Sequence, residues 1–218
     1  MKRLVFIVEG GTEISFVNQT VVPYLLGLGF NIPMTAQTII TNRKLHSKGG
    51  VVNYQYYKND VLRVLAQPET IVTSLIDFFK LPTNFPDYTI DSNAIAKIEA
   101  AIHKDLGSPN NFIPYIQRHE IESLMFSDIK GFELMLDKDA QLEQIKEIVN
   151  GYPNPEDINN SPETAPSKRL EKIYNYDKIS DGELIFEMIG IENIIEKCPR
   201  FSAWLNLLVN KLDEFNCR

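Results

Sequence analysis

The chain is short of cysteine, of long apolar runs and of nucleotide-binding glycine motifs, and each shortage removes a class of protein. Its two cysteines, Cys198 and Cys217, lack metal-ligand spacing, so we expect two free thiols in a cytosolic protein. No segment approaches 18 consecutive apolar residues, so no membrane span is predicted. The motif G-x-x-x-x-G-K-[ST] is missing, so ATP hydrolysis by this chain alone is not expected.

Basic residues are also scarce. The chain has 22 Lys and Arg against 29 Asp and Glu, which leaves a net charge of −7. This balance disfavours a constitutive DNA-coating protein, because phosphate binding needs clustered basic residues. It is compatible with a nuclease whose basic residues are local and whose phosphate contacts are partly made by a metal ion. The N-terminus has no basic, apolar and small-residue leader, so we expect a cytoplasmic protein.

The chain does have an α/β pattern over roughly its first 120 residues and a helical pattern after them. Apolar runs alternate with segments of helical periodicity, which is typical of parallel βαβ units. We therefore predict an α/β domain over residues 1–128, with a mostly parallel sheet of about four strands. A helical C-terminal extension over residues 129–218 is expected to pack on it as one compact unit. The predicted strands are 2–8, 35–41, 69–76 and 112–118. The predicted helices are 12–29 with Thr12 as N-cap, 52–66, 92–106, 168–174 with Ser167 as N-cap, and two more within 181–212.

An acidic residue follows three of the four predicted strands: Glu9, Asp77 and Glu120. The carboxyl ends of parallel strands line one edge of an open sheet, where ligands bind. Carboxylates gathered there repel each other unless a hard divalent cation shares them. The pattern therefore indicates a metal-assisted site that acts on an anionic substrate. Taken singly, each acid also has a structural interpretation, as a helix cap, a local turn or a partner of the helix dipole.

Two family resemblances rest on quoted segments. Residues 8–13 read VEGGTE and resemble the opening motif of TOPRIM domains, the metal-dependent catalytic folds of topoisomerases, primases and overcoming-lysogenization-type nucleases. Three other segments resemble the bacterial family called domain of unknown function 4276. They are QRHEIESLMFSD at 117–128, PEDINNSPETAPSKR at 155–169, and CPRF at 198–201 with the Trp204–Leu205 pair.

The TOPRIM resemblance implies site residues and a cofactor. The first-strand glutamate acts there as general acid or base and corresponds to Glu9, and the first aspartate of an Asp-x-Asp pair corresponds to Asp77. The second aspartate is replaced by Phe79, which disfavours a two-metal mechanism. We hypothesise that Glu120 supplies the missing ligand to Mg²⁺ or Mn²⁺. Further candidate ligands are Glu13, Glu122 and Asp128.

Phosphate contacts are predicted in two places. The loop after the second strand holds the best local basic cluster, and its glycines suit contact with a nucleic-acid backbone. A solvated surface loop is the alternative. The candidate residues are Arg43, Lys44, His46 and Lys48. His119 is a further candidate, and a hydrogen-bonded structural histidine is its alternative.

These observations lead to a metal-dependent nuclease of TOPRIM type, with Glu9, Asp77 and Glu120 at the site and DNA or RNA as substrate. The alternative is a non-catalytic TOPRIM-like module that binds or regulates a partner ATPase. A phosphatase or nucleotide-binding enzyme on the same scaffold stays open, because fold does not determine substrate. The family resemblance implies a partner ATPase of the structural-maintenance type, and a role in phage defence or DNA repair.

Overall fold

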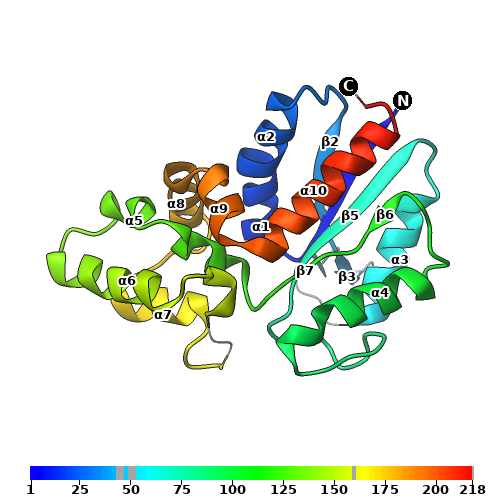
Figure 1. Ribbon diagram of the computed structural model, residues 1–218. Coiled ribbons are helices and arrows are strands. Elements are labelled where there is room, and N and C mark those ends of the chain that lie inside the picture. The colour runs from blue at the N-terminus through cyan, green and yellow to red at the C-terminus, as the bar shows by residue number, and fades with distance from the viewer. Residues whose placement is uncertain (43–46, 49–52, 159–160, 218) are drawn as a thin grey trace.

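The computed structural model describes residues 1–42, 47–48, 53–158 and 161–217. Its centre is a parallel sheet in the order β2-β1-β5-β6, and a further strand, β7, pairs with the end of β5 (Figure 1). The strands are β1 (Arg3–Val8), β2 (Met34–Thr38), β5 (Thr70–Asp77), β6 (Phe112–Ile113) and β7 (Ile116–Gln117). The predicted α/β fold with a mostly parallel sheet is confirmed.

The sheet separates two apolar layers, because successive side chains of a strand point to opposite faces. In β1, Leu4, Phe6 and Val8 face one cluster of buried residues, and Val5 and Ile7 face the other. The first layer contains α1 (Gly11–Phe16), a π-helical stretch (Val17–Val21), α2 (Val22–Gly27) and α10 (Pro199–Glu214). The second contains α3 (Tyr54–Leu65) and α4 (Ile95–Asp105), which follows a 3-10 turn (Ser92–Ala94) (Figure 1). Burial on both faces explains why β1 is a continuous apolar run. In β5, Thr73 and Ser74 interrupt the apolar residues, and their buried hydroxyls are hydrogen-bonded to backbone carbonyls.

The predicted strand 112–118 is wrong as a single element, because it forms β6 and β7 with a break between them. Pro114 lies in the break and has no N–H to give to a ladder. Tyr115 donates its N–H to the Ser74 hydroxyl at 3.0 Å instead of to a strand carbonyl. The sheet therefore has five strands where about four were expected.

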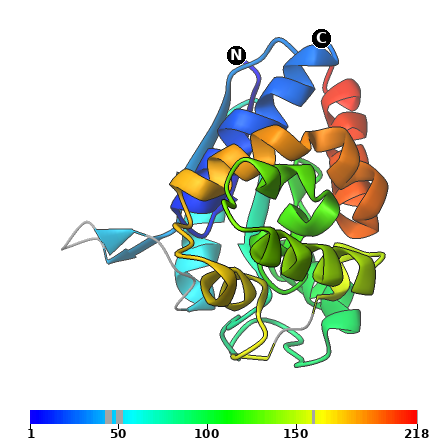
Figure 2. The same ribbon diagram turned by 90° about the vertical axis from the view of Figure 1, so that its left-hand side faces the viewer.

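The predicted strand 35–41 also divides in two. β2 ends at Thr38, and Ile40–Asn42 forms β3, which pairs antiparallel with β4 (Ser47–Lys48). The Ile40 N–H donates to the Asp60 carboxylate at 2.7 Å, which ties the start of β3 to α3. Figure 2 shows this hairpin projecting from the body of the molecule.

The C-terminal part is helical, as predicted, but its boundaries differ. A 3-10 helix (Ile121–Ser127) leads into α5 (Lys130–Glu133), α6 (Asp139–Gly151), a 3-10 turn (Pro155–Asp157), α7 (Pro166–Ile173), α8 (Ser180–Ile189) and α9 (Ile191–Lys197). Three helices occupy 181–212 instead of two. Gly190 ends α8 with a φ of 76°, and Pro199 begins α10.

Helix α10 returns across the sheet, so the helical part and the sheet share one apolar layer. The Trp204 indole N–H donates to the Thr73 hydroxyl of β5 at 2.9 Å. The Trp204 ring stacks on Tyr115, with centroids 4.7 Å apart. No helix in the described part of the chain is long and apolar enough to cross a membrane.

Candidate functional site

The ends of β1 and β5 bring Glu9 and Asp77 together. The two strands pair in parallel, with Val8 opposite Leu75, so Glu9 and Asp77 leave the sheet at the same edge. The Asp77 N–H donates to the Glu9 carboxylate at 3.3 Å. Glu13, in the first turn of α1, is buried beside them and accepts the Gly10 N–H at 2.8 Å. The helix begins at Gly11, so the prediction that Thr12 caps it is wrong.

Two more acids reach the same edge from the segment after β7. Glu120 and Glu122 are both buried. The Asp77 carboxylate accepts the Ile121 N–H at 3.0 Å, which joins this segment to the end of β5. Glu122 forms an ion pair with Lys178 at 2.8 Å. We call the five residues Glu9, Glu13, Asp77, Glu120 and Glu122 the acidic cluster.

Burial and mutual repulsion raise the pKa values of three carboxyl groups in the acidic cluster. Burial, followed by repulsion from Glu9 and Glu122, raises the pKa of Glu13 to about 7. Burial also raises the pKa of Asp77 well above its ordinary value, and the other four acids of the cluster add to the shift. The pKa of Glu122 is raised by burial and by Glu120, although Lys178 opposes the shift. Near neutral pH the site is therefore short of positive charge.

The donor set fits a hard divalent cation, because it consists of carboxylate oxygens and the repulsion among them is not fully neutralised. Within the described residues, however, no three His, Cys, Asp or Glu side chains are arranged so that they could hold a metal ion together. Several of the oxygens accept protein hydrogen bonds instead. The chemistry of the cluster suits the ion, while its arrangement is held by protein donors.

Glu120 is oriented by the N-terminus of α7. Its two carboxylate oxygens accept the Ser167 N–H and the Ser167 hydroxyl, both at 3.0 Å. Helix α7 begins at Pro166 and its N-cap is Ala165, so the predicted capping role of Ser167 is wrong. Ser167 instead serves a carboxylate that lies 47 residues away in the sequence.

His119 lies at the end of β7, but its side chain has other electrostatic neighbours than the acidic cluster. Burial and the nearby Arg118 guanidinium lower the pKa of His119 to about 4, and Asp157 opposes the shift. Its backbone is left-handed, with a φ of 66°, and its Nδ1 is buried without a hydrogen-bond partner in the described structure. A neutral imidazole cannot contribute positive charge to phosphate binding near pH 7.

The remaining predicted residues fall into two groups. Arg43, Lys44 and His46 lie outside the described residues, and of Lys48 only its backbone in β4 is described, so their role in phosphate binding stays a prediction. Asp128 accepts the Lys130 N–H at 3.0 Å and lies 3.7 Å from the Lys130 ammonium. Phe79 donates its N–H to the His119 carbonyl at 2.9 Å, at the position where an aspartate was expected.

Sequence reasoning missed Lys178, which no motif marks. The sequence also did not explain the role of the segment 155–169. The structure shows that this segment contacts α10 and Arg118. Glu156 is fully buried and accepts the Arg200 and Phe201 N–H groups, at 2.8 and 3.1 Å, at the start of α10. Arg118 is ion-paired with Asp157. The three quoted family segments therefore meet in space.

A protein-family model described as Domain of unknown function (DUF4276) matches residues 8–209. The chain belongs to this family. Neither a search of curated proteins nor a search of solved structures found a match to this DUF4276 protein. The contacts among the three segments join the start of α7 to Glu120 and the start of α10 to Glu156. The segments that carry the family pattern therefore hold these helices in place.

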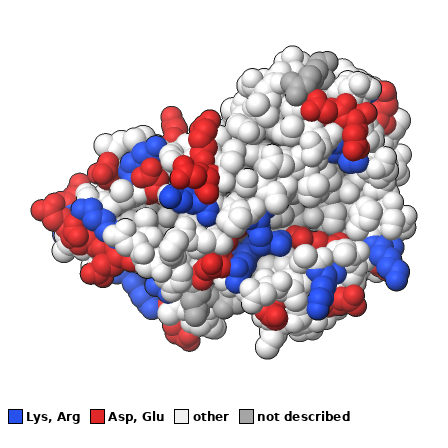
Figure 3. All heavy atoms as spheres, in the orientation of Figure 1, with Lys and Arg blue, Asp and Glu red and all other residues white. Residues whose placement is uncertain are grey.

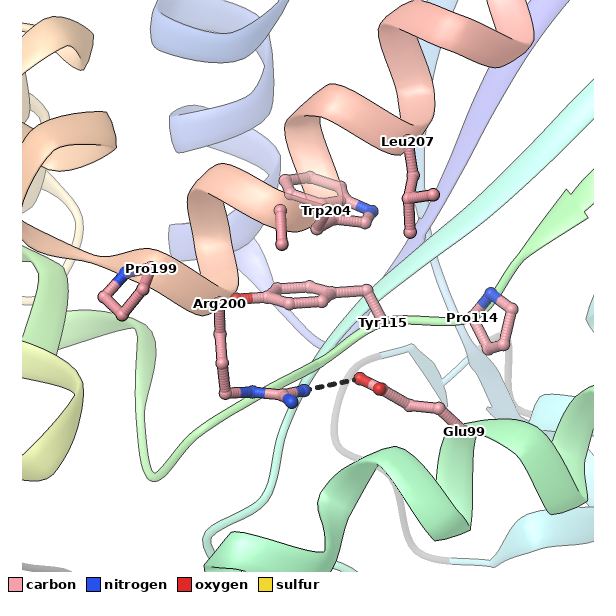
Figure 4. A pocket seen from close by; sticks show the side chains of 8 residues that line it. Glu99, Pro114, Tyr115, Pro199, Arg200, Trp204 and Leu207 are labelled. Carbon is pink, nitrogen blue, oxygen red and sulfur yellow. Dashed lines mark hydrogen bonds and ion pairs between the residues drawn. The ribbon is translucent and has the colours of Figure 1, made fainter.

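A separate cavity of about 260 Å³ lies between α4, α10 and the segment before β7 in this DUF4276 protein. Tyr115, Trp204 and Leu207 form much of its wall, and Arg200 pairs with Glu99 at 2.8 Å across it (Figure 4). It shares no residue with the acidic cluster. Figure 3 shows basic and acidic side chains interleaved on one face of the described structure, without a continuous basic stripe.

Proposed function

We propose that this chain is a metal-dependent nuclease of TOPRIM type that hydrolyses phosphodiester bonds in the cytoplasm with Mg²⁺ or Mn²⁺. The observation that carries the proposal is the convergence of Glu9, Asp77 and Glu120 at the ends of β1, β5 and β7, with Glu13 beside them. Parallel sheets place their ligand sites at this edge.

The residues divide the work as follows. Glu9, Glu13, Asp77 and Glu120 would hold the cation, and Glu9 would also move a proton as general acid or base. When bound, the cation supplies an activated water, neutralises phosphate charge and stabilises the leaving oxygen. The Ile121 N–H fixes one oxygen of Asp77, and Ser167 fixes both oxygens of Glu120, so both side chains are oriented before substrate binds.

Metal binding is the first test. Calorimetry with Mn²⁺ should give stoichiometric binding to the wild type and none to Glu9→Gln or Asp77→Asn. Asp128→Asn is the matched control and should bind as the wild type does, because Asp128 pairs with Lys130. Absence of Mn²⁺ uptake by every folded form of the protein, including variants that lack the Lys178 charge, would contradict the metal site.

Cleavage is the second test. Asp77→Asn should abolish Mn²⁺-dependent cleavage of DNA or RNA without lowering the melting temperature, because the asparagine oxygen can still accept the Ile121 N–H and the neutral side chain removes repulsion from the cluster. Full activity in this variant would show that Asp77 does not take part in the chemistry.

Two further parts of the proposal rest on the sequence: the first on a local basic cluster, and the second on the family resemblance. Arg43, Lys44, His46 and Lys48, the basic cluster that follows the second predicted strand, would contact the nucleic-acid backbone. A partner ATPase of the structural-maintenance type would act with the nuclease in phage defence or DNA repair. Co-purification of the two proteins, with and without nucleic acid, tests this partnership.

A second candidate function is a non-catalytic module that binds or regulates such an ATPase. The observation that favours it is the engagement of the cluster by protein donors, with no three donors placed for a metal in the described structure. Phe79 at the position of the second aspartate agrees with it. A module of this kind should tolerate Glu9→Gln without change in metal affinity or in binding of the partner.

A further inference from the structure

One cation reaches the acidic cluster from the helical half of the chain. The Lys178 ammonium lies 2.8 Å from a Glu122 carboxylate oxygen, and the Glu122 side chain is 1% exposed. Lys178 itself is 48% exposed, so its ammonium enters the cluster from the protein surface. The positive charge of the ammonium offsets part of the repulsion among the closely placed carboxylates.

The segment that carries Lys178 is ordered by its own contacts. Asp177 accepts the N–H groups of Ile179 and Ser180 at 3.1 and 2.8 Å, which forms a tight turn before α8. Ile179 packs against the turn between β1 and α1, where a Cβ on Gly11 would lie 3.4 Å from it. The Ser15 hydroxyl donates to Glu183, which fastens α8 to α1. Lys178 is thus held between a tight turn and a residue, Ile179, that contacts the start of α1.

The charge of Lys178 acts on more than its direct partner. Burial alone would lower the pKa of Lys178, yet Glu122, followed by Glu120 and Asp77, raises it above its ordinary value. The same ammonium therefore stabilises acids from the ends of both β5 and β7.

We propose that the Lys178 ammonium is the built-in counter-ion of the acidic cluster and competes with the divalent cation for it. This inference rests on the proposed function, because it assigns Lys178 the role of setting metal affinity at that site. The ammonium neutralises the carboxylates in the metal-free protein. A divalent cation binds when the flexible lysine stem withdraws toward solvent, since two positive charges at one cluster repel each other.

Mn²⁺ titration calorimetry of wild type, Lys178→Met and Lys178→Gln tests the competition. Methionine keeps the length of the stem without its charge, and glutamine keeps a donor for Glu122. Both variants should bind Mn²⁺ about tenfold more tightly than the wild type, because a competing positive charge is gone. Lys178→Arg keeps the charge and should bind within about twofold of the wild type. Lys130→Met is the matched control, because Lys130 pairs with Asp128, and should also stay within about twofold.

A second readout needs no metal. Without Mn²⁺, Lys178→Met should melt at a lower temperature than the wild type, because Glu122 is left buried and unpaired, and adding Glu122→Gln should restore most of the loss. Lys178→Gln covers the case in which the methionine variant does not fold.

The outcomes separate the two proposals. Equal or weaker Mn²⁺ binding in folded Lys178→Met and Lys178→Gln, with stoichiometric binding in the wild type, overturns the role of Lys178 alone. Binding in the variants but not in the wild type supports it strongly. If wild type and variants all fold and none binds Mn²⁺, the metal site of the proposed function fails, and the competition fails with it.

Discussion

At the scale of single residues, the acidic cluster consists of buried and half-buried carboxylates, and Lys178 is the cation described in contact with them. The hydrogen bonds of the cluster come from backbone N–H groups at Gly10, Asp77 and Ile121, and from Ser167. These donors stabilise the charged forms, while burial and repulsion oppose them. The balance leaves Glu13 and Asp77 with raised pKa values, so the pH of the solution decides how much charge the metal-free cluster carries.

Glu13→Gln should therefore change the pH dependence of stability. The pKa of Glu13 is raised from 4.5 to about 7 on folding, so the folded state keeps a proton that the unfolded state has released. The stability that this proton provides is fully present below pH 4.5, falls as the pH rises, and is lost above about pH 7. The glutamine is neutral throughout, and its oxygen can still accept the Gly10 N–H. In urea unfolding, the free energy of unfolding of the variant relative to the wild type should increase between pH 5 and pH 8, by a few kcal/mol at most. An equal difference at both pH values would contradict the shift.

Ser167→Ala should destabilise the protein by about 1–3 kcal/mol, because the hydroxyl donates to a buried, charged carboxylate. The remaining Ser167 N–H bond still orients one oxygen of Glu120. Urea unfolding at pH 7 measures the change. Ser202→Ala, a partly exposed position in α10, is the control and should stay within about 0.5 kcal/mol of the wild type. Equal effects at the two serines would show that the bond to Glu120 contributes little.

At the scale of secondary-structure elements, the helical part depends on close packing of short helices. Gly131 in α5 lies against α8, where an added Cβ would be 2.7 Å from a side-chain carbon of Ile189 and 3.0 Å from the Ile185 carbonyl oxygen. The backbone of Gly131 does not have a conformation that requires glycine. Glycine is needed there because it has no side chain, which allows α5 and α8 to approach each other closely.

Gly131→Ala should therefore cost about 1–3 kcal/mol of stability, since the Ile185 backbone cannot move aside cheaply. Gly27→Ala is the matched control, because an added Cβ meets nothing within 4 Å and Gly27 is the last residue of α2. Alanine has the higher helix propensity, so this variant should be neutral or slightly more stable. The two midpoints of urea unfolding compare them directly. A Gly131→Ala variant as stable as the wild type would mean that α5 and α8 separate without cost.

Element positions were predictable where local patterns decide them. β1 is a continuous apolar run, β5 has apolar pairs on both sides of Thr73 and Ser74, and both strands are buried on both faces, so the strands and the acids that follow them were found from the sequence. The break at Pro114 and the hairpin after β2 were not, because backbone N–H groups donate to the Ser74 hydroxyl and to the Asp60 carboxylate in place of the expected ladders. The same reason hid Lys178 and the true role of Ser167, whose partners lie far away in the chain.

At the scale of the whole molecule, one hydrophobic core contains residues from both parts of the predicted division, 1–128 and 129–218. Phe6 of β1 packs edge-on against Trp204 of α10, with ring centroids 6.3 Å apart, and Trp204 also contacts Phe201. Both belong to the same buried cluster as residues of α8 and of the 3-10 helix after Glu120. The helical part could not unfold without exposing one face of the sheet.

We therefore expect a single cooperative unfolding transition. Trp204 is the one tryptophan of the chain and lies where α10 meets β5, so its fluorescence reports the contact between the two parts. Far-ultraviolet circular dichroism reports all the helices together. If the parts form one unit, the two probes should give the same urea midpoint and the same slope. Trp204→Phe should lower the free energy of unfolding by about 1–3 kcal/mol without splitting the transition, as circular dichroism would show. The substitution leaves the Thr73 hydroxyl without its indole donor and removes aromatic packing. Fluorescence that changes well before the helices melt would instead identify α10 as a separately unfolding element, and the helical extension as a second domain docked on the sheet.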